Sequence, residues 1–110
     1  MDPQELAQFL VARANIGDIE GMVELYEPDA CLDIGAGNVA RGADQIREFY
    51  SRFLASGVRF NLGEQRAALI NGNIALTSTR LPNGTTTAEV ARRQIDGSWR
   101  WCIDQPKIAS

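Results

Sequence analysis

The apolar residues of this chain repeat with a helical period before Gly57 and mainly with a strand period after it. Stretches at 2–14, 18–26 and 43–54 space their apolar side chains three and four residues apart, which is typical of amphipathic helices. After Gly57 the chain consists of alternating or β-branched runs separated by Asn-Gly, Pro-Asn-Gly and Asp-Gly turns. This order predicts an α+β fold, in which three N-terminal helices pack on a curved antiparallel sheet and form a cone with an internal pocket.

Local signals set the expected ends of these elements. Asp2, Pro3 and Glu5 form a capping pattern for the first helix, and Asp18 can cap the second. Gly21 costs the second helix about 1 kcal/mol of intrinsic propensity, so this helix needs tertiary support. The expected strands cover residues 30–34, 39–41, 58–62, 73–81, 85–95 and 99–104, and a proline at position 106 ends the last one.

The last predicted strand carries bulky or polar groups on both of its faces. Simple alternation places Trp99, Trp101 and Ile103 on one face, and places Arg100, Cys102 and Asp104 on the other. Such a strand is expected to be covered on both sides. Because the three helices cover only one face of the sheet, we expect a homodimer formed through the outer sheet face.

Length and charge narrow the class of protein. The 110 residues are expected to form a single domain, 1–110, with a formal net charge of −3. Arg92-Arg93 is the only basic doublet, so no nucleic-acid partner is expected. The apolar runs are too short to cross a membrane and the N-terminus is polar, so we expect no membrane partner and a cytoplasmic location. Cys31 and Cys102 are expected to be free thiols.

The chain contains no histidine, which removes several kinds of chemistry. Ser-His-Asp and Cys-His nucleophiles and histidine-ligated zinc are excluded. Gly35 and Gly37 form no nucleotide-binding motif, and no cluster of metal ligands is visible, so neither a cofactor nor a metal is expected. Acid–base chemistry would depend on carboxyl groups, tyrosine, cysteine or Lys107.

Five segments carry a resemblance to a known superfamily. They are residues 15–18, 26–30, 41–50, 96–100 and 103–106. On these segments the chain resembles the nuclear-transport-factor-like, or cystatin-like, cone superfamily, and within it the SnoaL-like and ketosteroid-isomerase-like proteins. The resemblance implies a pocket for a small apolar organic ligand. It also implies possible cofactor-independent isomerase, cyclase or dehydratase chemistry, and the alternative is a non-catalytic ligand-binding or dimerisation module of the same fold. Whether the chain is an enzyme stays open here.

The resemblance also bears on single residues. The positions of the ketosteroid isomerase base, tyrosine and carboxylic acid fall at Ile34, Leu10 and Ala91, none of which can do that chemistry. Asp104, between Ile103 and Gln105, matches the context of the acid–base aspartate of the SnoaL-type cyclases, whose assisting histidine is absent here.

These considerations predict two catalytic residues, Asp104 as the acid–base group and Asp33 as its assistant. The alternatives are that Asp104 caps the turn before Pro106 or pairs with an arginine, and that Asp33 is an ordinary exposed strand residue. Glu89 either faces the ligand or forms an ion pair with Arg80 on the preceding strand.

Aromatic residues complete the predicted site. The expected ligand-binding residues are Tyr26, Tyr50, Phe53, Glu89 and Trp101. The alternative for the aromatic members of this set is a place in the core or in a dimer interface.

Overall fold

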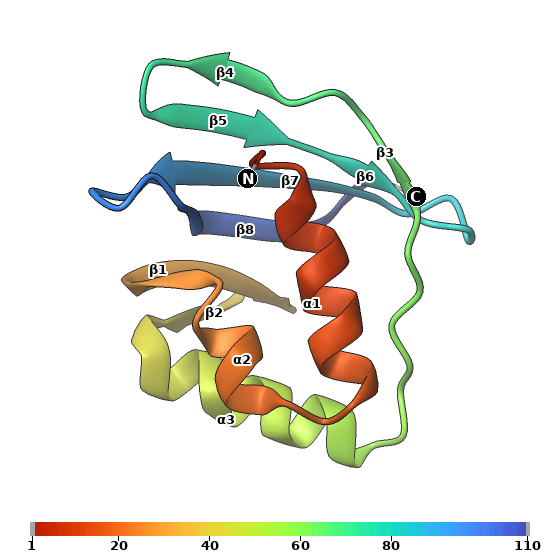
Figure 1. Ribbon diagram of the computed structural model, residues 1–110. Coiled ribbons are helices and arrows are strands. Elements are labelled where there is room, and N and C mark those ends of the chain that lie inside the picture. Colours follow the sequence, from red (N-terminus) through yellow and green to blue (C-terminus); the bar gives the residue numbers. More distant parts are fainter. Residues whose placement is uncertain (1, 110) are drawn as a thin grey trace.

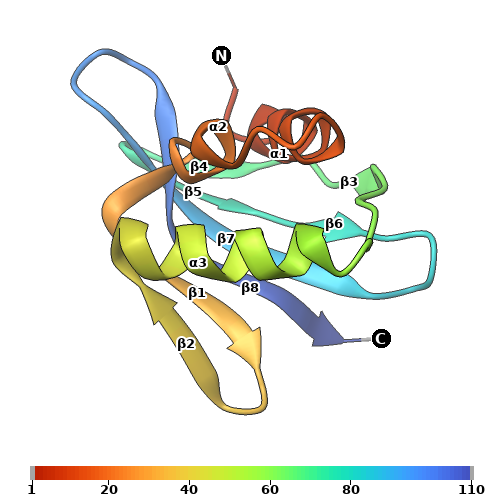
Figure 2. The same ribbon diagram turned by 90° about the horizontal axis from the view of Figure 1, so that it is seen from below.

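Three helices lie on one face of a curved, open sheet in the computed structural model, which describes residues 2–109 (Figures 1 and 2). The helices are α1 (Glu5–Asn15), α2 (Ile19–Val23) and α3 (Gly42–Ala55). The strands are β1 (Tyr26–Gly35), β2 (Asn38–Arg41), β3 (Glu64–Gln65), β4 (Leu69–Asn71), β5 (Ile74–Thr77), β6 (Thr79–Arg80), β7 (Thr86–Arg93) and β8 (Trp99–Ala109). The α+β fold class expected from the sequence is therefore confirmed.

The sheet is mixed rather than wholly antiparallel. Its strands follow the order β2-β1-β8-β7-β5-β4, and β6 pairs with both β7 and β3. β1 and β8 run parallel to each other, with Leu32 beside Asp104, whereas the other neighbours are antiparallel. The parallel pair brings an early strand beside the last one, in the middle of the sheet.

The helix starts differ in how they are capped. Gln4, not Asp2, occupies the N-cap position of α1, and its side chain makes no capping bond. The Asp2 backbone N–H instead donates to Glu5 Oε1 at 3.0 Å, which is one half of the expected pattern. Asp18 caps α2 as predicted, since its Oδ1 accepts from the Gly21 N–H at 3.0 Å.

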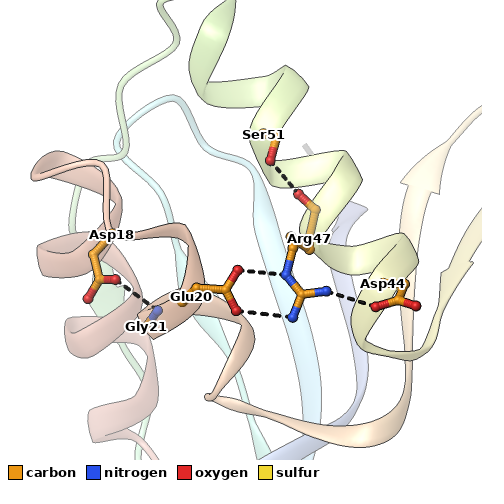
Figure 3. A network of polar contacts seen from close by, with 6 residues as sticks. All are labelled: Asp18, Glu20, Gly21, Asp44, Arg47 and Ser51. Atoms are coloured by element: carbon orange, nitrogen blue, oxygen red, sulfur yellow. Dashed lines mark hydrogen bonds and ion pairs between the residues drawn. The ribbon is translucent and has the colours of Figure 1, made fainter.

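A polar network supports the short helix α2 against α3 (Figure 3). Arg47 on α3 donates from Nε to Glu20 on α2 at 2.6 Å and from Nη1 to Asp44 at 2.8 Å. The charged groups are partly or fully exposed, so each of these pairs contributes little to stability. They add to the tertiary support that α2 gains from burying Met22 and Val23.

The core lies between the helices and the concave face of the sheet. Its largest fully buried side chains are Leu6, Met22, Leu32, Ile46 and Trp101, together with Pro3. Each helix contributes at least one of these residues. The helical stripes of the sequence therefore mark the correct inward faces.

One predicted strand begins too late, and another does not form. β1 begins at Tyr26, four residues before the predicted strand, so Tyr26 belongs to this strand and not to the second helix. Residues 58–62 form no strand: they link α3 to β3 with Val58 and Leu62 about half exposed. An alternating segment forms a strand only where a neighbour is available to pair with its backbone.

The last strand contains a bulge that reverses the predicted faces of Ile103 and Asp104. Val90 pairs with Ile103 and Ala91 pairs with Trp101, so Cys102 is an extra residue in β8. Asp104 is consequently buried on the inner face with Trp101, while Ile103 is 52% exposed on the outer face. β8 also continues past Pro106 to Ala109, because the proline lies in a second irregularity of the β7–β8 ladder.

Candidate functional site

A cavity of about 690 Å³ lies between α1, α3, the segment 58–63 and the inner face of the sheet. Its walls are mainly apolar, which suits an organic ligand. Aromatic rings form a continuous part of the wall: the ring centroids of Phe49 and Tyr50 are 5.3 Å apart, and those of Phe53 and Phe60 are 5.4 Å apart. Trp101 lines the sheet side of the same cavity.

Asp104 lies in this wall at the end of a chain of hydroxyl groups. The hydroxyl of Tyr26 donates to Asp104 Oδ2 at 2.6 Å, and the hydroxyls of Tyr26 and Tyr50 are also 2.6 Å apart. Since the Tyr26 hydrogen points to the carboxyl group, Tyr50 is the donor in the second bond. All three residues are at least 95% buried, so the chain Tyr50–Tyr26–Asp104 is shielded from bulk solvent.

Glu89 is the cross-strand neighbour of Asp104. The two residues are directly paired between β7 and β8, and both are more than nine-tenths buried. Glu89 Oε1 accepts a hydrogen bond from the Thr77 hydroxyl at 2.7 Å. Paired residues on one face of a sheet have Cβ atoms about 5 Å apart, so the two carboxyl groups lie within strong electrostatic reach of each other.

This environment changes how the acids titrate. Burial, followed by the nearby charge of Glu89, raises the pKa of Asp104 to about 7, although the Tyr26 hydrogen bond acts against the rise. Burial likewise raises the pKa of Glu89, opposed by the hydroxyl groups of Thr87 and Thr77. Burial and the Asp104 charge raise the pKa of both Tyr26 and Tyr50, which keeps these phenols protonated. A group with a pKa near 7 can act as either an acid or a base at neutral pH.

Asp33 reaches the same cavity from β1. It is only half buried, and its Oδ1 accepts a hydrogen bond from the Gly35 N–H at 3.0 Å. Its charge has a smaller effect than that of Glu89 in raising the pKa of Asp104. The acid that faces Asp104 most directly is therefore Glu89, and the assisting role of Asp33 stays a prediction.

The other predicted residues are distributed around the cavity as follows. Tyr50, Phe53, Glu89 and Trp101 line it, whereas Tyr26 reaches the site only through its hydroxyl group beneath Asp104. Trp101 Nε1 is buried and has no hydrogen-bond partner within the described part of the chain.

Further residues of the site went unidentified in the sequence. They are Phe49 and Phe60, which line the cavity, and Thr77 and Thr87, which contact Glu89. The apolar stripe of α3 could have identified Phe49, but nothing in the sequence marks the threonines.

The ion-pair alternatives do not occur. Arg80 is exposed and pairs with Glu64 in the β3–β6 ladder, and no ion pair joins an arginine to Glu89 or Asp104 among residues 2–109. Over the same residues, no group of three or more cysteine, aspartate or glutamate side chains is placed to hold a metal ion. No described helix combines the length and the apolar character needed to span a membrane.

Comparison with known proteins agrees with this architecture. A family model for the SnoaL-like domain matches residues 7–110. No match was found among proteins with curated functions.

Several solved structures share the fold. A ketosteroid isomerase-like protein from Erwinia carotovora atroseptica superposes with a TM-score of 0.69 at 22% identity, covering 96% of this chain and 92% of that one. An NTF2-like protein with a cystatin-like fold from Novosphingobium aromaticivorans gives 0.69 at 21% identity, covering 92% and 75%. A putative calcium/calmodulin-dependent protein kinase type II association domain from Thiobacillus denitrificans gives 0.75 at 11% identity, covering 94% and 91%. At these identities the likeness concerns the fold alone.

Proposed function

The chain belongs to the SnoaL-like domain family, and on that premise we propose that it binds a small, largely apolar organic molecule and transfers a proton on it through Asp104. One observation carries this proposal: a carboxyl group with a pKa of about 7 lies in the wall of a 690 Å³ apolar cavity. Acid–base groups work best when their pKa lies near the working pH.

The neighbours of Asp104 have distinct parts in this proposal. Ionised Asp104 takes a proton from a C–H or O–H group of the ligand, and the resulting carboxylic acid returns it to another atom of the same molecule. Tyr26 holds the carboxyl group in place through its 2.6 Å hydrogen bond, and Tyr50 holds Tyr26. The buried charge of Glu89 keeps Asp104 a strong enough base, and Asp33 assists from the β1 side of the cavity. Such a reaction belongs to the class of isomerisations, cyclisations and dehydrations.

Proton transfer can be measured without knowing the natural substrate. Small apolar carbon acids, with and without an amino group, are incubated with the protein in D₂O, and deuterium incorporation is followed by NMR. We expect catalysed exchange with the wild type and a loss of at least about a hundredfold in Asp104→Asn, since one positioned acid–base group contributes about 10²–10⁴. The variant must retain its fold and bind the same compound.

The result separates the proposal from its alternative. Tight binding with no exchange in the wild type would identify the chain as a non-catalytic ligand-binding module. Exchange that survives in Asp104→Asn would assign the acid–base role to another group.

We also propose that two copies associate through the outer face of the sheet. The ladders place Leu69, Leu76, Val90 and Ile103 side by side across β4, β5, β7 and β8. Leu69, Leu76 and Ile103 are 70%, 48% and 52% exposed, and the helices cover the opposite face (Figure 2). A contiguous apolar row of this kind is typical of a protein–protein interface. The association domain named above is one structural relative with this fold.

A further inference from the structure

We propose that the cavity selects an organic cation, namely a protonated amine on an apolar body, and binds its nitrogen against Asp104 and Glu89. This inference rests on the proposed function, because it names the ligand class for the same cavity. It goes further in stating which charge the ligand carries.

The first support is that the two buried acids have no cationic partner among residues 2–109. Asp104 and Glu89 are 5% and 6% exposed and are paired across β7 and β8. Their hydrogen-bond donors are hydroxyl groups, from Tyr26 and Thr77 respectively. Asp104 Oδ1 accepts no hydrogen bond from any residue between 2 and 109, although Asp104 lines the cavity. This oxygen is available to accept an N–H from a bound ligand.

The charges elsewhere in the cavity wall do not neutralise this pair. Arg59 and Lys107 also line the cavity, but both are exposed, and neither forms an ion pair with an acid of the wall in the described chain. Asp33 adds a third acid to the wall from β1. The innermost part of the cavity is therefore acidic, and its cations lie where water can solvate them.

Charge balance then favours a cation over a neutral or anionic guest. A charge in a water-poor site is strongly disfavoured unless an opposite charge accompanies it. One ammonium group beside one ionised carboxyl gives a neutral pair, with the second carboxyl free to stay protonated. An anionic ligand would instead face the unneutralised acids of the wall.

The aromatic wall suits the same guest. Phe49, Tyr50, Phe53 and Phe60 form a connected set of rings across the cavity from the sheet. Ring faces attract cations within about 6 Å of the centroid, and this attraction strengthens when the cation is desolvated. The same rings bury the apolar body of the ligand.

The pH dependence of binding follows from the groups that face Asp104. Tyr26 from β1 and Tyr50 from α3 stay protonated, because burial raises the pKa of each phenol. The acids that face Asp104 are Glu89 from β7 and Asp33 from β1, and Asp104 itself changes charge with pH. With the pKa of Asp104 at about 7, an amine must displace its proton at pH 5–6 but not at pH 8. Affinity for the amine is thus expected to rise with pH, and affinity for a neutral ligand is not.

A matched pair of probes tests the inference. Adamantylmethylamine and adamantylmethanol have the same apolar body and differ in charge, and their binding to the full chain is measured by calorimetry between about pH 5.5 and 8. At about pH 7.5 we expect the amine to bind at least about tenfold more tightly, given the strength of a desolvated ion pair. This preference should fall below about threefold in the double variant Asp104→Asn/Glu89→Gln, which leaves neither buried acid beside the nitrogen. It should persist in Glu24→Gln, which removes an acid at an exposed site outside the cavity.

Each outcome has a defined meaning. Equal or tighter binding of the alcohol by the wild type overturns the inference and leaves the apolar cavity of the proposed function intact. If neither probe binds, the proposed ligand cavity itself fails. Should the double variant not fold, the pH profile of the wild type decides: an amine affinity that does not rise between pH 5.5 and 8 contradicts the inference.

Discussion

The Asp104 carboxyl group is held where its charged form is poorly stabilised. It is 5% exposed, its direct hydrogen-bond donor is the Tyr26 hydroxyl, and its cross-strand neighbour is a second buried acid. A structural carboxylate would ordinarily be paired with a cation or left in water. Stability sacrificed at a single residue is a common feature of functional sites, because the same desolvation that costs stability adjusts the pKa.

This arrangement predicts how stability depends on pH. The pKa of Asp104 is about 7 in the folded protein and 3.8 for an ordinary aspartate in an unfolded chain, so the folded state retains a proton that the unfolded chain releases. The stability that the folded protein gains by keeping Asp104 protonated is complete below about pH 4, declines as the pH rises, and is lost above about pH 7. Asp104→Asn mimics the neutral acid, so its free energy of unfolding should exceed that of the wild type by up to about 4 kcal/mol at pH 8. This difference should shrink towards pH 4.

Urea unfolding at about pH 4, 5, 6, 7 and 8 measures this difference. Glu24→Gln serves as the control, since it removes an acid at an exposed site outside the cavity. Glu89, whose pKa is also raised by burial, keeps part of the pH dependence in the Asp104 variant. A wild-type profile unaffected by Asp104→Asn would show that folding does not raise the pKa of Asp104.

Among the elements, the helices were predictable and the strand faces were not. A helix displays its buried face in its own sequence, as α3 does with Ile46, Phe49 and Tyr50. The bulge in β8 left no such signal, because Trp101, Cys102 and Ile103 are all apolar and any of them could be the extra residue. One extra residue turns every later side chain to the opposite face.

The same reason limited prediction of the site. Asp104 was identifiable through the family resemblance, but its pairing with Glu89 depends on the register of β7 and β8. Tyr26 forms hydrogen bonds with Tyr50, which is 24 positions away in the sequence, and with Asp104, which is 78 positions away. Local sequence patterns do not encode contacts over such separations. The sequence could thus indicate which residue types carry the chemistry, and only the tertiary pairing brings them together.

Gly63, in the link between α3 and β3, has no room for a larger residue. A Cβ atom built there would lie 2.4 Å from the backbone oxygen of Arg80, where β6 passes closest. Backbone cannot rotate away as a side chain can, so Gly63→Ala must displace β6 or the cavity wall that Gly63 lines. We expect a loss of about 2 kcal/mol in the free energy of unfolding, as for other overpacked sites.

Gly21→Ala is the matched comparison. There the added Cβ meets the Asp18 side chain, which can move at the cost of the α2 cap, and alanine recovers about 1 kcal/mol of helix propensity. Thermal and urea unfolding should therefore rank Gly63→Ala as clearly the less stable of the two. The opposite order would mean that residues 58–63 adapt without disturbing β6.

At the scale of the whole molecule, the sheet presents two different apolar faces. The inner face meets the helices and holds the cavity, with Trp101 and Asp104 directed inwards. The outer face carries the row of apolar side chains that includes Leu76 and Ile103. The bulge at Cys102 makes this arrangement possible, because it places Trp101 and Asp104 on the same inner face, whereas simple alternation would place them on opposite faces. A partner that covers Ile103 would therefore stabilise the strand that positions Asp104.

The proposed dimer can be disrupted at this row without touching the cavity. A stable interface buries about 800 Å² on each partner, which is roughly an eighth of the 6502 Å² surface of the chain and within reach of a face spanning β4 to β8. Leu76→Lys places a charge in the middle of the row, so we expect the dimer dissociation constant to rise at least about a hundredfold, because an unpaired buried charge costs about 3–5 kcal/mol.

Ile95→Lys is the control, since Ile95 is fully exposed in the β7–β8 turn, away from the row. Sedimentation equilibrium should find the wild type and Ile95→Lys as dimers and Leu76→Lys as a folded monomer. A monomeric wild type at high concentration, or a Leu76→Lys variant that stays dimeric, would mean that the apolar row is not the interface.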